Sequence, residues 1–444
     1  LNNNCIYKDL PTLKNIVEAF EHPDPKTMEE IIPLAKETLI NLNRSFNVNK
    51  MSLESKYNSF NITDRSNAKE IIKKSLEAIY NPGNRIPSGY KLFDKMIGGG
   101  FQGERVYTLL GSAKTFKSGT MLNIAMNVCT HYDEYDLQDP DKTPAVLYFT
   151  VENSMIETFE RIYHYLGLNF NFRYEYKTTK TGKKIKKYII TESDVDSILD
   201  TIEKETIYKT GIALRIEFRT HMSVDTGELD KLYENYSLID NQEIIFVVQD
   251  YIKRIHSQRQ YRTEQKRDEL GEVINEFCNF AKQRHIPVLT ASQLNREAQK
   301  MIESAKNKKK KDIGRKLGGS MVGESSLIYE NADYTISIYR EIDEDTDTLY
   351  QSFHLLMARG ESYIDYFAQP YDKDPKYHKF RIATDYDCKE PLGIERVSNL
   401  ADPNDIKVIE NATQNIKVRK PINLKELAEA DEEIEEDDRS NEFI

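Results

Sequence analysis

The chain has 444 residues and a formal charge of −11, with 62 Lys and Arg against 73 Asp and Glu. Such a balance argues against a nucleic-acid partner, because phosphate binding depends on clustered Lys and Arg. The charge is unevenly distributed, however, since residues 426–444 alone hold ten acidic side chains and one Arg. The preceding residues carry only −2 and contain two basic islands, 173–187 and 300–316. The total charge therefore excludes no partner.

Length, cysteine usage and hydropathy limit the class of protein. The length fits one large α/β domain with a smaller appendage, or two to three small domains. The four cysteines are far apart and form no CxxC pair, which favours a reduced intracellular chain. No apolar run approaches the roughly 18 residues that span a bilayer, and the start Leu1-Asn-Asn-Asn shows no signal peptide. We expect a soluble, cytoplasmic protein.

The first 84 residues have a helical pattern. Asp24-Pro25 offers an N-cap with proline at the first helical position, and apolar residues from Met28 to Leu39 recur at helical spacing. A second amphipathic helix opens near Ser66 and ends at Asn81-Pro82-Gly83. We therefore predict a helical region over residues 1–65 and a linker helix over residues 66–84.

From residue 85 onward, short β-branched or aromatic runs alternate with helical stretches. Near-continuous apolar strands separated by helices are typical of a mostly parallel sheet covered on both faces. The sequence thus predicts an α/β domain over residues 85–400, whose last strands are candidates for antiparallel pairing. The predicted strands are Arg105–Leu110, Val146–Val151, Leu214–Arg219, Ile244–Val248, Val288–Ala291, Tyr334–Tyr339 and Phe353–Met357. The predicted helices are Thr120–Tyr132, Ser154–Leu166 and Leu270–Arg284.

Apolar periodicity fades after about residue 400. We expect a C-terminal extension over residues 401–444, whose run of like charges repels itself and should be disordered. Solubility explains such a tail, and competition with DNA or docking of a replication partner is a second explanation.

A candidate phosphate-binding loop follows the first predicted strand. Backbone amides and a helix N-terminus can wrap phosphates, while Lys neutralises charge and Ser ligates magnesium. The common form of this loop has glycine where this chain has Phe116, so a surface turn is the alternative explanation. The candidate residues are Gly111, Ser112, Ala113, Lys114, Thr115, Phe116, Lys117 and Ser118.

Three later strands end in side chains that nucleotide hydrolysis needs. Glu152 and Asp250 each follow an apolar strand, and Gln293 ends a third. Ligands bind outside the carboxyl ends of parallel strands, so these side chains should meet there. One acid can hold magnesium, the other can orient or deprotonate water, and the amide can sense a terminal phosphate.

The ordered set of motifs resembles the DnaB-type replicative helicases from about residue 80 to 370. It comprises Ile86-Pro-Ser-Gly-Tyr-Lys-Leu-Phe-Asp94, the phosphate loop, Tyr148-Phe-Thr-Val-Glu152-Asn, Asp250-Tyr-Ile, Pro287-Val-Leu-Thr-Ala-Ser-Gln293-Leu-Asn-Arg296 and Glu330-Asn-Ala-Asp333. The resemblance implies a RecA-like motor. Because the chain is rich in Asn, Lys and Ile and lacks a full-size N-terminal domain, we compare it with phage-encoded members, which would act in the bacterial host cytoplasm.

The resemblance also implies roles for single residues. Lys117 would contact the β and γ phosphates of ATP, and Ser118 and Asp250 would hold Mg²⁺. Glu152 would activate water, and Gln293 would couple the γ phosphate to DNA. Arg359, in Leu355-Leu-Met-Ala-Arg-Gly360, would be an arginine finger that reaches a neighbouring subunit. The family usually has lysine at Met357, so Phe116 and Met357 are two departures that put turnover in doubt.

Two basic segments are candidates for DNA contact. The island after Gln293 lies where RecA-like motors have a loop facing the ring channel, and a solvated flexible loop is the alternative. The candidate residues there are Arg296, Lys300, Lys306, Lys308, Lys309, Lys310, Lys311, Arg315 and Lys316. The island from Arg173 to Lys187 predicts a β-hairpin whose tyrosines can stack bases, although hairpin tyrosines more often pair across the strands.

The sequence thus favours an ATP-dependent helicase that forms a ring, expected to be a hexamer, and moves 5′ to 3′ on single-stranded DNA. A primase, a helicase loader and a single-strand-binding protein are the partners that the resemblance implies. A RecA-like recombinase or a KaiC-like circadian-clock ATPase is one alternative. A non-catalytic DNA clamp or scaffold with a degenerate ATP site is another.

Overall fold

The computed structural model describes residues 85–220, 224–259, 266–294, 326–343, 346–377 and 379–395, with a few scattered residues before and between these ranges. Residues 1–395 form the first of the two units into which the chain divides. The predicted N-terminal helices lie almost wholly outside the described residues, and the acidic tail lies entirely outside them.

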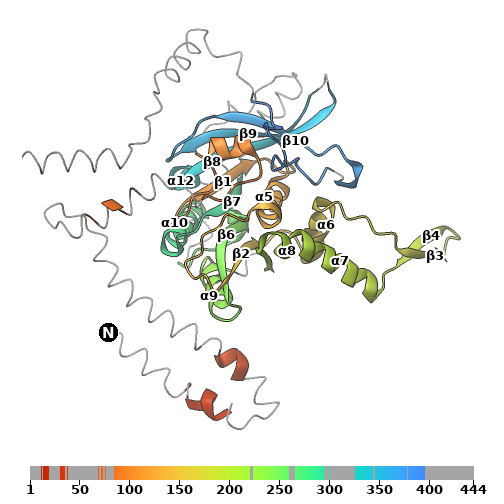
Figure 1. Ribbon diagram of the computed structural model, residues 1–444, viewed down its shortest axis with the longest axis horizontal. Coiled ribbons are helices and arrows are strands. Elements are labelled where there is room, and N and C mark those ends of the chain that lie inside the picture. Colours follow the sequence, from red (N-terminus) through yellow and green to blue (C-terminus); the bar gives the residue numbers. More distant parts are fainter. Residues whose placement is uncertain are drawn as a thin grey trace, which may run out of the picture. The chain divides into compact units, whose positions relative to one another are not determined.

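An eight-stranded sheet forms the centre of the first unit, in the order β10-β9-β8-β1-β7-β6-β2-β5 (Figure 1). The six strands from β8 to β5 in that order are parallel, whereas β9 is antiparallel to β8 and β10 is antiparallel to β9. The strands are β1 (Val106–Gly111), β2 (Thr143–Thr150), β5 (Ala213–Phe218), β6 (Gln242–Asp250), β7 (Val288–Gln293), β8 (Tyr334–Asp343), β9 (Thr348–Ala358) and β10 (Tyr366–Pro370). The predicted mostly parallel α/β fold is therefore confirmed.

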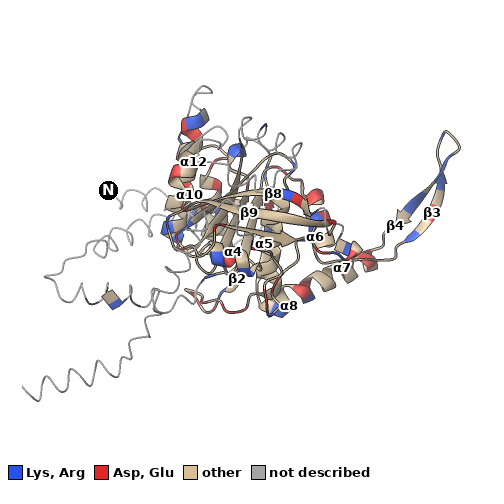
Figure 2. Cartoon of the chain, turned by 90° about the horizontal axis from the view of Figure 1, so that it is seen from above, with Lys and Arg blue, Asp and Glu red and all other residues tan. Residues whose placement is uncertain are grey.

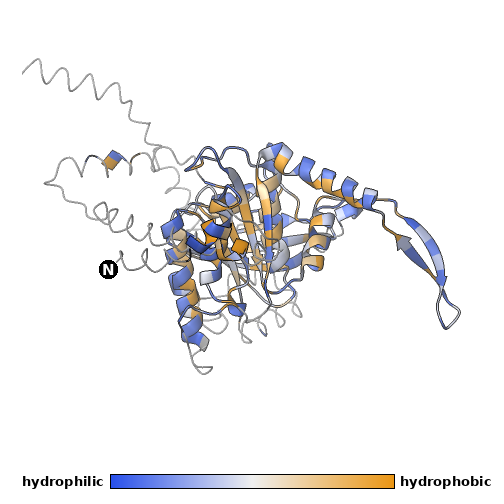
Figure 3. Ribbon diagram, turned by 90° about the horizontal axis from the view of Figure 1, so that it is seen from below, coloured by the Kyte–Doolittle hydropathy of each residue, from blue (hydrophilic) through white to orange (hydrophobic). Residues whose placement is uncertain are grey.

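Helices cover both faces of the sheet, because successive strand residues point to opposite sides. Tyr107 and Leu109 of β1 pack in one hydrophobic cluster with α4 (Lys91–Met96), α5 (Lys117–His131) and α6 (Met155–Tyr165). Val106 and Leu110 pack in the other with α9 (Gly227–Leu238), α10 (Lys266–Arg284) and α12 (Ser326–Asn331). In Figure 3 the apolar colours concentrate on the strands and on the helix sides that meet them.

All seven predicted strands and all three predicted helices are present, with ends shifted by a few residues. The predicted hairpin is also present as β3 (Arg173–Thr178) and β4 (Lys184–Ile189), followed by α7 (Glu192–Glu205) and α8 (Ile207–Thr210). Strand β10 was not predicted from the sequence. It is short and ends at Pro370, and proline suits the edge position that β10 occupies.

No helix in the described ranges is long and apolar enough to cross a membrane. Cys129, Cys278 and Cys388, the cysteines in these ranges, are free thiols.

Candidate nucleotide site

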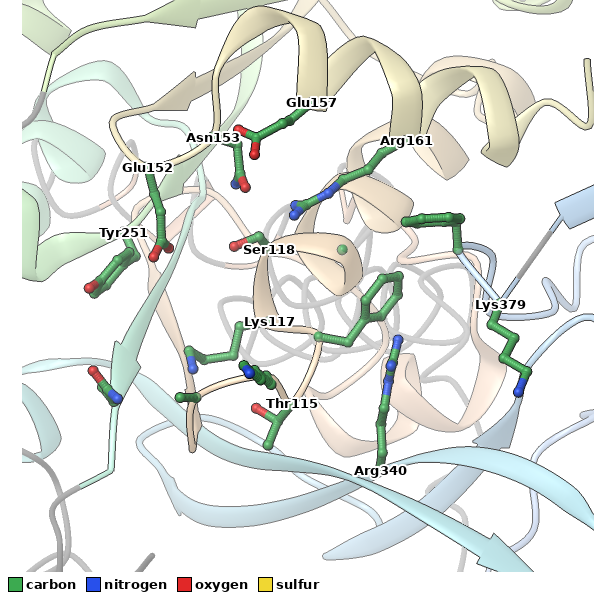
Figure 4. A pocket seen from close by; sticks show the side chains of 16 residues that line it. Thr115, Lys117, Ser118, Glu152, Asn153, Glu157, Arg161, Tyr251, Arg340 and Lys379 are labelled. Carbon is green, nitrogen blue, oxygen red and sulfur yellow. The ribbon is translucent and has the colours of Figure 1, made fainter. Parts of the chain in front are cut away.

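A cavity of about 750 Å³ opens at the carboxyl ends of the parallel strands. Four sequence-predicted elements meet there: the loop after β1, the residues after β2, the residue after β6 and the end of β7 (Figure 4). The parallel register sets Gly111 beside Gln293 and Thr150 beside Asp250, which explains why side chains so far apart in sequence converge. The lining residues include Ala113, Lys114, Thr115, Phe116, Lys117, Ser118, Glu152 and Gln293.

The loop after β1 leads directly into the N-terminus of α5, and two of its residues, Lys114 and Phe116, have positive φ. Lys117 folds back over it, and its Nζ donates to the carbonyl oxygens of Gly111 at 2.9 Å and Ser112 at 2.7 Å. Burial lowers the pKa of Lys117 to about 8, although Glu152 and Asp250 favour its charged form. The partly buried Lys117 ammonium is thus bound by two uncharged carbonyl oxygens of the loop.

Phe116 caps α5 in the left-handed conformation, with φ 69° and ψ 27°. A non-glycine residue there costs roughly 1–2 kcal/mol, because the β-carbon crowds the following carbonyl. The ring turns aside toward Gly119, and the guanidinium of Arg340 lies 4.4 Å from its centroid. Phe116 thus keeps the backbone conformation that suits glycine at this position.

Asp250 ends β6 and is fully buried. Its carboxylate accepts hydrogen bonds from Ser118 Oγ at 3.0 Å, Asn153 Nδ2 at 2.8 Å and the Tyr148 hydroxyl at 3.2 Å. Burial raises the pKa of Asp250 to about 6, and the Ser118 hydrogen bond opposes that rise. Ser118 and Asp250 are therefore in direct contact, and their oxygens are of the type that Mg²⁺ prefers.

Glu152 follows β2 and presents an exposed carboxylate to the same cavity. Within the described ranges it forms no ion pair or side-chain hydrogen bond, and only its backbone N–H is bound, to Thr150 Oγ1 at 3.3 Å. The next element, α6, begins with a capping box in which Ser154 and Glu157 bond each other's backbone N–H groups. This cap fixes the turn that carries Glu152 over the cavity.

Two arginines that line the cavity were not predicted from the sequence. Arg161 lies on α6, its side chain extends toward Ser118 in Figure 4, and its buried Nη1 has no hydrogen-bond partner among the described residues. Arg340 lies on β8, and its Nε donates to the Tyr371 hydroxyl at 2.9 Å. Neither stands in a recognisable motif. Arg340 reaches the cavity because β8 continues beyond Ser337, the last residue that pairs with β1.

Arg359 lies at the other edge of the sheet. Because β9 runs antiparallel to β8, Ala358 pairs with Tyr334, where β8 begins, whereas the cavity lies where the parallel strands end. Arg359 is exposed, and its Nη2 donates to the carbonyl of Glu330 at 2.5 Å. Met357 is partly buried and packs in the hydrophobic cluster with α10 and α12. Neither residue lines the cavity of its own chain.

Most of the candidate DNA-binding residues lie outside the described part of the chain. Lys300 is the exception, and it is exposed. The structure therefore gives no geometry for Arg296, Lys306, Lys308, Lys309, Lys310, Lys311, Arg315 and Lys316.

The sheet and the loop between Gly111 and Ser118 define a RecA-like P-loop protein. The model of the divergent DnaB-like ATPase family matches residues 27–362, and the chain belongs to that family. The replicative DNA helicase DnaB of Rickettsia bellii (strain RML369-C) is 23% identical over 249 residues, which are 54% of this chain and 42% of that relative. This chain therefore spans less than half of the length of that relative.

Two solved structures are similar. One is an ATPase domain with 13% identity and a TM-score of 0.47, over 70% of this chain and 98% of that domain. The other is a DnaB-like replicative helicase, described with its interactions with primase, which has 14% identity and a TM-score of 0.48, over 79% of this chain and 78% of that one.

Proposed function

We propose that this chain is an ATP-hydrolysing motor that forms a ring, a hexamer by analogy with its family, and moves 5′ to 3′ along single-stranded DNA as a helicase. One observation carries the proposal. The P-loop residues, Ser118 among them, share a cavity with Glu152, and Ser118 contacts the buried Asp250, whereas Arg359 lies at the opposite edge of the sheet. This division of groups suits hydrolysis at an interface between subunits.

Lys117 and the loop amides would bind the phosphates of ATP. The Lys117 ammonium now binds two loop carbonyls, and exchanging them for β- and γ-phosphate oxygens would bring its charge to the substrate. Arg161 has a buried Nη1 without a protein partner in the described ranges, so a phosphate oxygen would satisfy it. Arg340 would add positive charge beside Phe116.

Ser118 and Asp250 fit a magnesium ion, because a hydroxyl and a carboxylate already meet at 3.0 Å beside the phosphate loop. When bound with the nucleotide, Mg²⁺ neutralises charge on the phosphate oxygens. The hydrogen bonds from Asn153 and Tyr148 fix the orientation of the Asp250 carboxylate.

Glu152 would orient the attacking water and accept its proton. An exposed carboxylate without a protein hydrogen bond in the described ranges is available for water, which suits this role. Gln293 lies next to Gly111 in the sheet, and we propose that its amide senses the terminal phosphate. Residues 295–325 follow it directly and would carry the signal to DNA through their basic side chains.

Arg359 would complete the site of the neighbouring subunit. It lies at the opposite edge of the sheet from the cavity of its own chain. Its hydrogen bond to the Glu330 carbonyl holds the exposed guanidinium at the surface. A cation that reaches a neighbour's transferring phosphoryl group stabilises its developing charge. We further propose that residues 66–84 link adjacent motors, and that a primase, a loader or a single-strand-binding protein is a partner.

A non-catalytic DNA clamp is the second candidate. Phe116 and Met357 favour it, because both replace residues that the resemblance assigns to the nucleotide site. The left-handed conformation of Phe116 favours the motor instead, since its ring turns toward Gly119 and leaves the phosphate loop open.

DNA-stimulated ATP hydrolysis separates the two candidates. For a motor, wild type should hydrolyse ATP faster with single-stranded DNA, and Lys117→Ala should lower the rate about a hundredfold or more. Strand displacement on a forked duplex with a 5′ tail should then depend on ATP. Equal background rates in wild type and Lys117→Ala would support the clamp.

A further inference from the structure

The β3–β4 hairpin is a basic and aromatic surface that the nucleotide site does not use. Residues 173–190 contain seven Lys and Arg and one Glu, and every residue of both strands is exposed. Figure 2 shows basic residues along the hairpin and acidic residues on α7, which follows it. Figure 3 shows hydrophobic residues interleaved with the charged ones.

The strand register divides these side chains between two faces. Directly paired residues in antiparallel strands point to the same side. One side, here called the aromatic face, comprises Tyr174, Tyr176, Thr178, Lys184, Lys186 and Tyr188. The other, the aliphatic face, comprises Arg173, Glu175, Lys177, Ile185, Lys187 and Ile189.

Both faces carry the same net charge but differ in chemistry. The aromatic face has two lysines and no acid, a net +2, and the aliphatic face has three basic residues and one acid, also +2. Lys187 and Glu175 approach to 3.6 Å on the aliphatic face. Net charge therefore does not favour either face as a binding surface. The two faces differ in that the aromatic face carries the three tyrosines.

The tyrosines form one connected group. Tyr174 lies between Tyr176, at 5.6 Å between ring centroids, and Tyr188, at 6.0 Å, and Lys186 Nζ lies 4.3 Å from the centre of its ring. The outer two rings are the more exposed, Tyr176 at 61% and Tyr188 at 56%. The cross-strand pair stabilises the hairpin, while the outer rings remain open to a ligand.

This surface is unfavourable in water. Positive charges close together repel one another, and exposed aromatic groups are seldom gathered on a free surface. A single strand of nucleic acid would relieve both costs, because its phosphates neutralise Lys184 and Lys186 while its bases stack on the outer tyrosines. A duplex offers no open base faces for stacking.

We propose that the aromatic face of the β3–β4 hairpin is a second binding site for single-stranded nucleic acid, separate from the basic segment at residues 300–316. Tyr176 and Tyr188 stack bases, and Lys184 and Lys186 bind the intervening phosphates. The site does not require ATP hydrolysis, so it goes beyond the proposed motor function. Recognition by charge and stacking is independent of sequence.

A fluorescent reporter tests the site locally, because the chain contains no tryptophan. In the 444-residue chain, Tyr176→Trp reports on the aromatic face, and Ile185→Trp reports on the aliphatic face at a similar distance from the turn. An oligodeoxythymidine should quench the tryptophan at position 176 saturably and have little effect on the one at position 185. The same sequence paired in a duplex should quench neither.

Affinity measurements with matched variants test which side chains bind the nucleic acid. Tyr176→Ala with Tyr188→Ala should weaken binding of labelled oligodeoxythymidine about tenfold or more, whereas the two Phe substitutions should keep it. Lys184→Gln with Lys186→Gln, tested in the Tyr176→Trp background, should lower the slope of log affinity against log salt by about 1.4. Lys177→Gln with Lys187→Gln, which removes equal charge from the aliphatic face, should change it less.

Several results would overturn the proposal. Equal quenching at positions 176 and 185, or none at 176, would remove the aromatic face as the site. Unchanged affinity in the alanine variants, together with an altered oligomeric state in sedimentation, would identify the hairpin as a contact between subunits. ATP hydrolysis at saturating DNA should be normal in all hairpin variants, so failure of the motor proposal and failure of this one give different results.

Discussion

The ring of Phe116 occupies the space that a side chain at Gly119 would need, since a β-carbon built on Gly119 would overlap that ring. Two unusual features of the phosphate loop and the helix after it therefore depend on each other. Phe116 adopts the left-handed conformation, and Gly119, in the first turn of the helix, leaves room for its ring. Arg340 covers the ring and lies 5.0 Å from the ring centre of Tyr371.

This relationship predicts that Gly119→Ala is harmful only while Phe116 is present. Although alanine favours helix formation by about 1 kcal/mol over glycine, its methyl group would displace the Phe116 ring into the cavity. We expect Gly119→Ala to weaken ATP binding about tenfold and Phe116→Gly with Gly119→Ala to restore it. Isothermal titration with a nonhydrolysable ATP analogue measures both. Equal affinities of wild type and Gly119→Ala would show that the ring moves freely.

Arg161 should contribute to nucleotide affinity. Its buried Nη1 has no partner in the described protein and lines the cavity, so bound phosphate would supply the missing charged hydrogen bond. A hydrogen bond to a charged group contributes about 1.5–3 kcal/mol, so Arg161→Met should weaken ATP binding roughly tenfold to a hundredfold.

Arg215→Met is a matched control for that change. Arg215 lies on edge strand β5 and binds Gln242, outside the cavity lining. Titration of both variants with ATP should separate them clearly. Similar affinity losses would indicate a general structural effect, and no loss at Arg161→Met would exclude it from phosphate binding.

The sequence predicted the elements whose signals are local. Apolar runs predicted seven strands, and the polar residues at or just after their ends included Glu152 and Gln293, which line one cavity, and Asp250, which is buried beside it in contact with Ser118. Arg161 and Arg340 were missed because their approach to the cavity depends on how α6 and β8 pack, which no local pattern records. The separation of Arg359 from its own cavity depends on the antiparallel turn from β8 to β9, a feature of the sheet as a whole.

Asp94 predicts a pH dependence of stability. It lies on α4 and accepts the backbone N–H of Ser88 at 2.8 Å, and burial raises its pKa to about 7. The folded chain then binds this proton more tightly than the unfolded chain, so this group's contribution to stability falls as the pH rises from about 4 to about 7.

Asp94→Asn keeps an acceptor for Ser88 but carries no charge. We expect it to raise the free energy of unfolding by roughly 1–3 kcal/mol at pH 8, with a gain that shrinks as the pH is lowered toward 5. Urea unfolding across this range measures the difference, and the exposed Asp141→Asn is the control. A gain that is the same at every pH would show that the charge of Asp94 is not its cause.

Subunit complementation tests most directly whether each nucleotide site is shared between two subunits. Lys117→Ala and Arg359→Ala should each abolish DNA-stimulated ATP hydrolysis. In an equal mixture, an Arg359→Ala subunit with intact Lys117 can meet a Lys117→Ala neighbour with intact Arg359. About a quarter of random interfaces then contain a complete site. We predict that mixing the two inactive proteins restores a comparable fraction of the wild-type rate, whereas a mixture as inactive as either protein alone would contradict the shared site.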